Sequence, residues 1–164
     1  MIKVLIVAGS ALALAGCMHM SRSATVTALP AGDAANLKVT DIRLSVGASV
    51  KVTPQFQDIF RQHVQAKLDA CATGQRPVRL EAQVDRLDKS NAVLTAVVAG
   101  ANVLRGSAKL VDVKTGQTVA DYTVGQTVVG GRFAVVVMAE AEEQLSDGFG
   151  DELCKQLFPA ASKK

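Results

Sequence analysis

Apolar residues recur along this chain with two different periods, and the changes between the two outline its elements. From Leu37 to Val46 apolar and polar residues alternate, as in a strand, and the alternation changes phase near Thr40-Asp41, which predicts a β-bulge. Between residues 53 and 74 apolar residues recur every three or four positions, which predicts one apolar face of a helix. This stripe comprises Phe56, Ile59, Phe60, Val64, Leu68 and Cys71.

The ends of this helix carry their own signals. Thr53 is a residue type that caps free N–H groups, and Pro54 suits the first helical position because no N–H is needed there. Gly74 is expected to end the helix in the left-handed conformation that glycine adopts without strain.

The second half of the chain predicts a strand, a hairpin and a helix. Strict alternation over residues 78–88 predicts a strand with one wet face, and residues 106–124 predict a hairpin around the turn 112–116, where Asp112 accepts hydrogen bonds. Residues 133–158 predict the last helix, which Gly148 and Gly150 weaken by about 1 kcal/mol each and are expected to kink.

This order of elements predicts one α+β domain over residues 37–159. A strand with one wet face favours a mainly antiparallel sheet of about four strands, with two helices packed on one face. Residues 160–164 are expected to form a tail.

Residues 92–104 form an uncharged segment, AVLTAVVAGANVL, that is too short to cross a bilayer as a helix. One interpretation is a further strand followed by a turn at Gly100-Ala101-Asn102. The other is an exposed apolar surface that contacts a partner, because such patches usually mark contacts. The candidate contact residues are Val93, Leu94, Val97 and Val98.

The first residues have the pattern of a secretory signal peptide. Lys3 precedes an apolar run from Val4 to Leu14, and small residues follow before Cys17. Leu14-Ala15-Gly16-Cys17 resembles the lipobox of bacterial lipoprotein precursors. The resemblance implies that residues 1–16 are removed and that Cys17 becomes the acylated first residue, which anchors the protein to a membrane by its lipid, palmitate included.

The residues after Cys17 indicate how far the domain lies from the lipid and which membrane holds the protein. Residues 17–36 are rich in small and polar types, which predicts a flexible tether between the lipid and the domain. Lipoproteins without aspartate after the acylated cysteine are typically sent to the outer membrane, so Met18 implies the periplasmic face of that membrane on the same resemblance.

Two cysteines remain once Cys17 is set aside, Cys71 and Cys154. In an oxidising compartment such a pair usually bonds, which predicts a disulfide; two buried free thiols are the alternative. Cys154 lies off the apolar stripe of its helix, so the bond needs a kink or a twist of the last turn. Parallel helices would bring the two last turns together.

Charge and motifs exclude several kinds of function. The net charge is +3, falls by one with Lys3, and includes no run of basic residues, so no nucleic acid partner is expected. His63 and Cys71 are about 12 Å apart along one helix, too far for a nucleophile and its base. Asp85 and Asp88 are too ordinary a pair to indicate acid–base catalysis, and Glu140, Glu142 and Glu143 suggest a solvated helix face. No catalytic residue, metal or cofactor is predicted.

The sequence therefore favours a non-enzymatic lipoprotein that binds or helps to assemble another envelope component. The alternatives are a carrier of a small ligand and a periplasmic hydrolase without a short motif. The arrangement from Gly100 to Leu157 is similar to that of small envelope lipoproteins of uncharacterised function. In these an apolar, glycine-rich segment precedes a strand, an Asp-x-x-Thr-Gly hairpin and a final helix.

Overall fold

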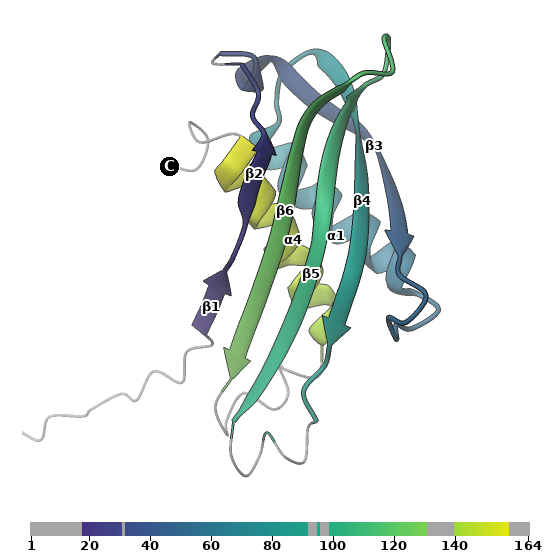
Figure 1. The fold of residues 1–164 in the computed structure, drawn as a ribbon, viewed down its shortest axis with the longest axis vertical. Helices are drawn as coiled ribbons and strands as arrows, with labels where there is room; N and C mark the ends of the chain where they lie inside the picture. The colour runs from purple at the N-terminus through teal and green to yellow at the C-terminus, as the bar shows by residue number, and fades with distance from the viewer. Residues whose placement is uncertain (1–17, 31, 92–94, 96–98, 131–139, 158–164) are drawn as a thin grey trace, which may run out of the picture.

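The computed structural model describes residues 18–30, 32–91, 95, 99–130 and 140–157. Its helices interrupt a series of strands along the chain (Figure 1). In chain order they are β1 (Met18–Ser21), β2 (Ala24–Thr27), the 3-10 helix η1 (Ala34–Asn36), β3 (Leu37–Val46), α1 (Phe56–Cys71), β4 (Arg76–Asp88), β5 (Gly100–Asp112), β6 (Thr118–Gly130) and α4 (Ala141–Leu157).

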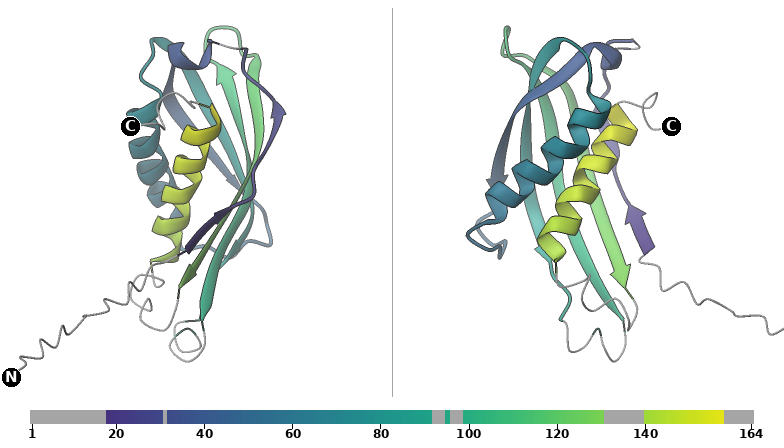
Figure 2. Two further views of the ribbon diagram at one scale, coloured as in Figure 1. Left: turned by 90° about the vertical axis from the view of Figure 1, so that its left-hand side faces the viewer. Right: turned by 180° about the vertical axis from the view of Figure 1, so that it is seen from behind.

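The strands form one sheet in the order β1-β6-β5-β4-β3, with β2 also paired to β6. Both helices lie side by side on one face of this sheet, which confirms the predicted α+β class (Figure 2). The sheet has six strands rather than about four, and β3 pairs with β4 in parallel. The parallel pair arises because α1 connects β3 to β4 as a crossover, whereas a strand's own alternation does not reveal the direction of its neighbour.

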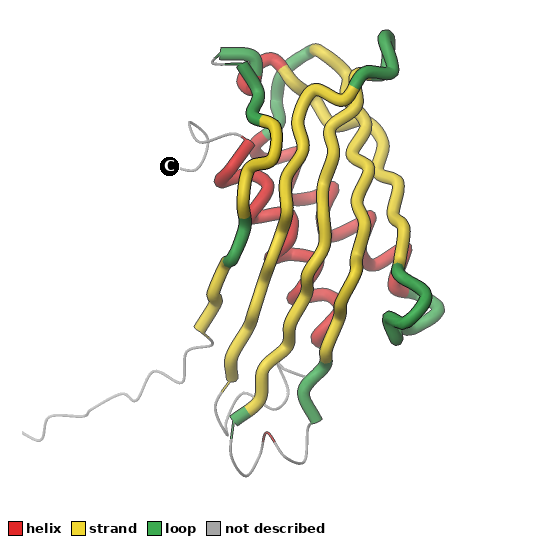
Figure 3. Tube along the Cα trace, viewed as in Figure 1, coloured by secondary structure: helices red, strands yellow, loops and turns green. Residues whose placement is uncertain are grey.

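The two additional strands come from the segment expected to be a flexible tether. β1 pairs antiparallel with β6, from Met18 opposite Val129 to Ser21 opposite Gln126, and β2 continues along the same strand (Figure 3). Both strands are four residues long and exposed along their whole length. Strands this short bury too little apolar surface to leave an alternating pattern, so the sequence predicted a tether where the structure has a sheet edge.

The core lies between the helices and the inner face of the sheet. Phe56, Phe60 and Phe149 are all fully buried, and the ring of Phe60 contacts those of Phe56 and Phe149 edge-on at centroid distances of 5.9 and 5.0 Å. The remaining buried residues are mostly Val, Leu and Ala from the inner face. The stripe predicted for α1 is therefore the one that packs.

The ends of α1 differ from their predicted form. The N-cap is Gln55 without a side-chain hydrogen bond, while Thr53 bonds to α4 instead. Gly74 is not left-handed; among the described glycines only Gly32 and Gly116 have positive φ. A Cβ on Gly74 would lie 2.1 Å from the carbonyl carbon of Asn36, so this glycine permits a close backbone approach.

The central hairpin is confirmed, with a longer first strand than predicted. The Asp112 carboxylate accepts hydrogen bonds from the N–H groups of Lys114 and Thr115 at 2.9 Å each, and Gly116 has φ of 70°. Hydrogen bonds from Thr115 and from the Arg76 guanidinium lower the pKa of Asp112 to about 2. The turn proposed at residues 100–102 is wrong, since these residues begin β5 opposite Gly130, Val129 and Val128.

The last helix is shorter than predicted at its start, and residues 133–139 of the predicted helix lie outside the described part of the chain. α4 continues through both of its inner glycines, which serve close packing. A Cβ on Gly148 would lie 2.7 Å from the Gln126 side chain of β6, and one on Gly150 would lie 2.7 Å from Lys67 of α1.

The predicted disulfide is present and joins Cys71 to Cys154 with a Cα–Cα distance of 5.8 Å. It links the last turns of α1 and α4. The two helices run parallel, which is the arrangement expected from the sequence to bring these turns together (Figure 2). The bond therefore joins the C-terminal ends of the two helices that cover this face of the sheet, and it encloses a loop of 83 residues.

Replacing both cysteines by alanine should lower the free energy of unfolding by about 4–5 kcal/mol, because a loop of 83 residues is then free in the unfolded chain. Denaturant unfolding without reductant measures this loss. The wild-type protein in excess reductant is the matched control and should show the same loss. A change below about 1 kcal/mol in both would contradict the assignment of this stabilisation to the bridge.

Candidate functional site

The polar side chains between the helices form a row of charged and hydrogen-bonded pairs. His63 Nδ1 lies 3.1 Å from Asp147 Oδ1, and Lys67 lies 3.3 Å from Asp151. Cys71, the nearest nucleophile by sequence, is held in the disulfide. This row therefore joins α1 to α4 along their solvent side, and His63 is a boundary histidine as predicted.

The remaining sequence candidates for acid–base or metal chemistry are not brought together. Asp85 accepts a hydrogen bond from Gln83 at 2.7 Å, and Asp88 accepts one from Arg86 at 2.6 Å. In the part of the chain that the structure describes, no three His, Cys, Asp or Glu side chains are placed to hold a metal ion. Within the same residues, no helix combines the length and apolar character needed to cross a membrane.

Glu142, at the start of α4, is a buried carboxylate. It accepts hydrogen bonds from the N–H and the hydroxyl of Thr53, and from Lys89 Nζ at 2.7 Å. Burial raises the pKa of Glu142, but the hydrogen bonds from Lys89 and Thr53 outweigh burial and leave the pKa below its usual value. The prediction of a solvated face is wrong for Glu142, because a glutamate with three donors around it can be buried.

Glu142 lies where the starts of both helices meet the end of β4, and its hydrogen bonds connect these three segments. It connects α4 to the residues before α1 and to the end of β4, so it holds the first turns of both helices against the sheet. An open cavity of about 330 Å³ lies beside it. The lining residues are Thr53, Gln55, Ile59, Lys89, Glu140, Ala141, Glu142 and Glu143.

Glu142→Gln should lower the free energy of unfolding at pH 7 by about 1–2 kcal/mol, because Lys89 is partly exposed and water replaces some of its interaction. Since folding lowers the pKa of Glu142, the wild-type advantage is complete above pH 4.5 and disappears as the pH falls through the folded-state pKa. Denaturant unfolding at several pH values tests this. Glu143→Gln, the half-buried neighbour, should have little effect; equal losses in both variants at all pH values would contradict the assignment.

Glu152, another buried carboxylate of α4, faces the N-terminal strands. It accepts a hydrogen bond from Gln156 at 2.7 Å and further ones from the hydroxyls of Ser21 and Ser23. Burial raises the pKa of Glu152, but these hydrogen bonds leave it below its usual value. The charge on α4 therefore holds the connection between β1 and β2.

β6 is shaped to accept the same N-terminal segment. The Arg22 N–H donates to the Gly125 carbonyl at 2.7 Å, and a Cβ on Gly125 would lie 2.4 Å from the Arg22 carbonyl oxygen. The buried Gln126 donates from Nε2 to His19 Nδ1 at 3.3 Å, and Gly148 leaves the space that Gln126 occupies. The residues after Cys17 are thus fixed by specific contacts.

A groove between β3 and α1 is the candidate binding site for another protein. It has a volume of about 520 Å³ and lies along the free edge of the sheet. Gln65 Nε2 donates to the Val39 carbonyl at 3.2 Å, next to the bulge that the sequence predicted between Val39 and Asp41. The lining residues are Thr40, Asp41, Ile42, Arg43, Arg61, Gln62 and Gln65.

The sequence did not predict this groove. Alternation over Leu37–Val46 identified the strand, but only the sheet order places that strand at an edge. The polar side chains of α1 opposite the apolar stripe were a signal of an exposed helix face, without indicating that β3 lies beside it.

The predicted site residues have different outcomes. Cys17 lies one residue before the described chain, and Val93, Leu94, Val97 and Val98 lie outside the described residues, so their roles stay predictions. Within the same segment Thr95 is buried and its hydroxyl donates to the Asn91 carbonyl at 2.8 Å, while Leu104 is buried in β5.

A smaller cavity bears on the alternative of a ligand carrier. It measures about 200 Å³ and lies between β2, the following loop and the end of α4. Tyr122 lines it, and burial raises the pKa of this phenol. Pockets for small organic ligands usually measure about 300–1,000 Å³, so this cavity is smaller than that range.

Comparison with known proteins identifies the fold. No family model matches the chain, and no curated protein matches it in sequence. The chain is similar in structure to the PelC dodecamer of Paraburkholderia phytofirmans, with a TM-score of 0.53 and 14% identity over 86% of this chain and 98% of that one. This similarity shows a shared fold.

Two other solved structures have lower similarity. Protein XCC0632 from Xanthomonas campestris is 17% identical over 85% of this chain and 95% of its own, with a TM-score of 0.46. A candidate lipoprotein of Caulobacter crescentus is 13% identical over 74% of this chain and 92% of its own, with a TM-score of 0.45.

Proposed function

We propose that this protein is a lipid-anchored lipoprotein of the cell envelope that acts as a non-enzymatic binding or assembly module. The observation that carries the proposal is the position of β1, which begins at Met18, one residue after the lipobox cysteine. A lipid on Cys17 would therefore be attached to a sheet edge, with no flexible tether between bilayer and domain.

The free edge supports the binding role. Among the described residues β3 pairs with β4 alone, and polar side chains line the groove beside it. An extended segment of a partner can add to such an edge by main-chain hydrogen bonds. In the strand order, β3 is four spacings from β1, or about 19 Å, which leaves this edge clear of the anchor.

The charges of the groove favour a protein partner over a small anion. Arg43 lies 3.4 Å from Asp41, and Arg61 lies 3.5 Å from Asp58, so each guanidinium already has a carboxylate beside it. Such a partner is another envelope protein or a second copy of this chain. The PelC structure, a dodecamer, is a relative in fold that assembles with itself.

The membrane arm is tested by Cys17→Ala in the full chain. The variant should lose the mass of the acyl groups at its N-terminus and leave the processed membrane fraction, because no other residue supplies the thiol. Mass spectrometry of the N-terminal peptide and membrane fractionation measure both effects. The proposal would be contradicted if the Cys17→Ala variant stayed in the membrane fraction as the wild type does, and if the N-terminal peptide of the wild type carried no acyl groups.

The binding arm is tested by a photo-crosslinking residue at Gln62, which lines the groove. It should form one discrete adduct, with an envelope protein or a second copy, that Arg43→Glu with Arg61→Glu reduces several-fold. Gln57, an exposed residue of the same helix outside the groove, is the matched control. Equal adducts at both positions, or none at either, would contradict a binding role for the groove.

A further inference from the structure

The sheet face not covered by the helices, called here the outer face, changes character along its length. Met18 of β1 pairs with Val129 of β6, which pairs with Ala101 of β5. Two residues along each strand, Met20 pairs with Thr127, which pairs with Val103. These six residues, five of them apolar and the sixth Thr127, are called the apolar rows, and they lie at the end of the sheet next to Cys17.

The direction of these side chains follows from the alternation of the strands. Val128 and Asn102, which lie between the rows, are fully buried on the helix side. Side chains one position before and after them must therefore point to the outer face. Met18 is 62% exposed and Met20 47%, which places two large apolar side chains in solvent beside the predicted lipid.

A row of arginines follows the apolar rows. Arg22 lies against Gly125, Gly125 is paired with Arg105, and Arg105 is paired with Arg86 of β4, so three guanidinium groups cross four strands at one level. Arg86 has Asp88 beside it, while Arg105 bonds to the carbonyls of Leu104 and Gln126. Across the described residues no carboxylate is paired with Arg22 or Arg105, so this level of the outer face is cationic.

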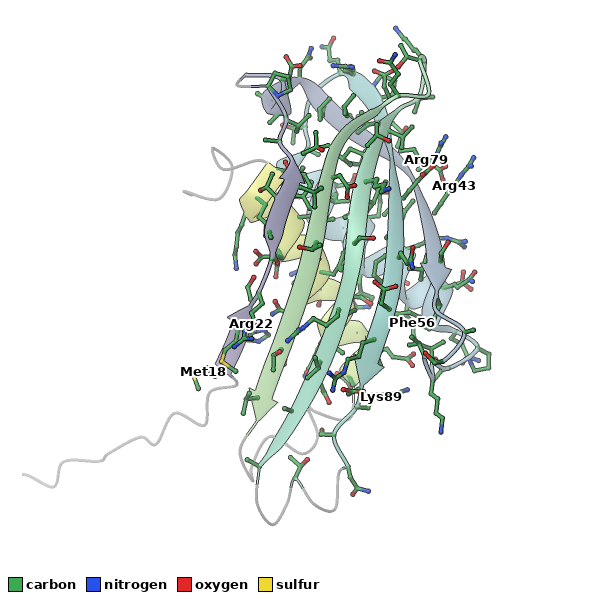
Figure 4. The ribbon with its side chains drawn as sticks, viewed as in Figure 1. Met18, Arg22, Arg43, Phe56, Arg79 and Lys89 are labelled. Carbon is green, nitrogen blue, oxygen red and sulfur yellow. A yellow bond between two sulfur atoms is a disulfide. The ribbon has the colours of Figure 1, made fainter. Side chains whose placement is uncertain are left out.

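The half of the outer face that is farther from Cys17 has no such excess of positive charge among its described residues. There Arg79 lies 2.8 Å from Glu81, and Lys109 lies 3.6 Å from Asp121, so charges of opposite sign are paired. Figure 4 looks onto the outer face and places Met18 and Arg22 at the anchor end and Arg79 toward the other end. Among the described residues, exposed apolar groups thus coincide with two arginines that have no carboxylate partner, Arg22 and Arg105, in the half that adjoins Cys17.

We propose that the apolar rows and the arginine row lie against the surface of the phospholipid bilayer that holds the lipid on Cys17, an inference that rests on the proposed function. Apolar side chains next to a belt of basic ones match the boundary between acyl chains and phosphates. Four residues of strand separate Met18 from Arg22, or about 13 Å. Strands perpendicular to the bilayer would carry the arginines beyond the phosphates, so the outer face lies obliquely on the membrane.

This orientation is tested in the full chain, expressed in its own membrane, with a photo-crosslinking residue at Met20. The expected product is an adduct with phospholipid, identified by its mass. The matched control is Val113, which is 49% exposed in the turn at the opposite end of the sheet and should give at least tenfold less lipid adduct. Arg22→Glu should reduce the adduct at position 20 several-fold, and Lys114→Glu in that distant turn should not.

The mass of the N-terminal peptide separates the two proposals. Acylated Cys17 with no lipid adduct at position 20, with equal adducts at positions 20 and 113, or with a protein adduct in place of lipid overturns the docking and leaves the anchor intact. An unmodified Cys17 overturns the proposed function, and the docking with it, because nothing then holds this end at a bilayer.

Discussion

The antiparallel pairing of β1 and β2 with β6 is the constraint on which the functional account depends. β6 accommodates that pairing with a glycine where the backbone of Arg22 comes close, and α4 adds a buried carboxylate that binds Ser21 and Ser23. Because β1 begins at Met18, the residue after Cys17, a lipid on that cysteine would set both the distance and the orientation of the domain relative to a membrane.

The two helices are fixed to each other and to the sheet at both of their ends. Their first turns are held through Glu142, which binds Thr53 and Lys89, and their last turns through the disulfide between Cys71 and Cys154. Between these ends the Phe60 and Phe149 rings meet in the core. A helix pair fixed at both ends leaves the edge strand β3 and its groove as a preformed surface that an extended partner segment could join without rearranging the core.

The sequence predicted the features that local pattern controls. The bulge near Thr40, the stripe of α1 and the turn at Asp112 follow from periodicity and turn chemistry, and parity predicted the disulfide. The features that it missed depend on contacts between distant segments. Gly74 is required because the backbone of Asn36 lies close to it, and Glu142 is buried because Lys89 and Thr53 donate hydrogen bonds to it. The strands after Cys17 form because they pair with β6. In each case the partner is distant in the sequence and is not part of any local pattern. The groove was missed for the same reason, since it exists only where β3 is an edge.

The most direct test is hydrogen exchange of the backbone amides of residues 18–27 in the lipidated protein on its membrane. If the N-terminal strands are part of the sheet, the amides that bond to β6 will exchange slowly, at rates comparable to those of the β5–β6 hairpin. Exchange of the whole segment at the rate of an unstructured peptide, with the β5–β6 hairpin still protected, would show a flexible tether. That result would contradict a domain whose orientation is fixed by its anchor.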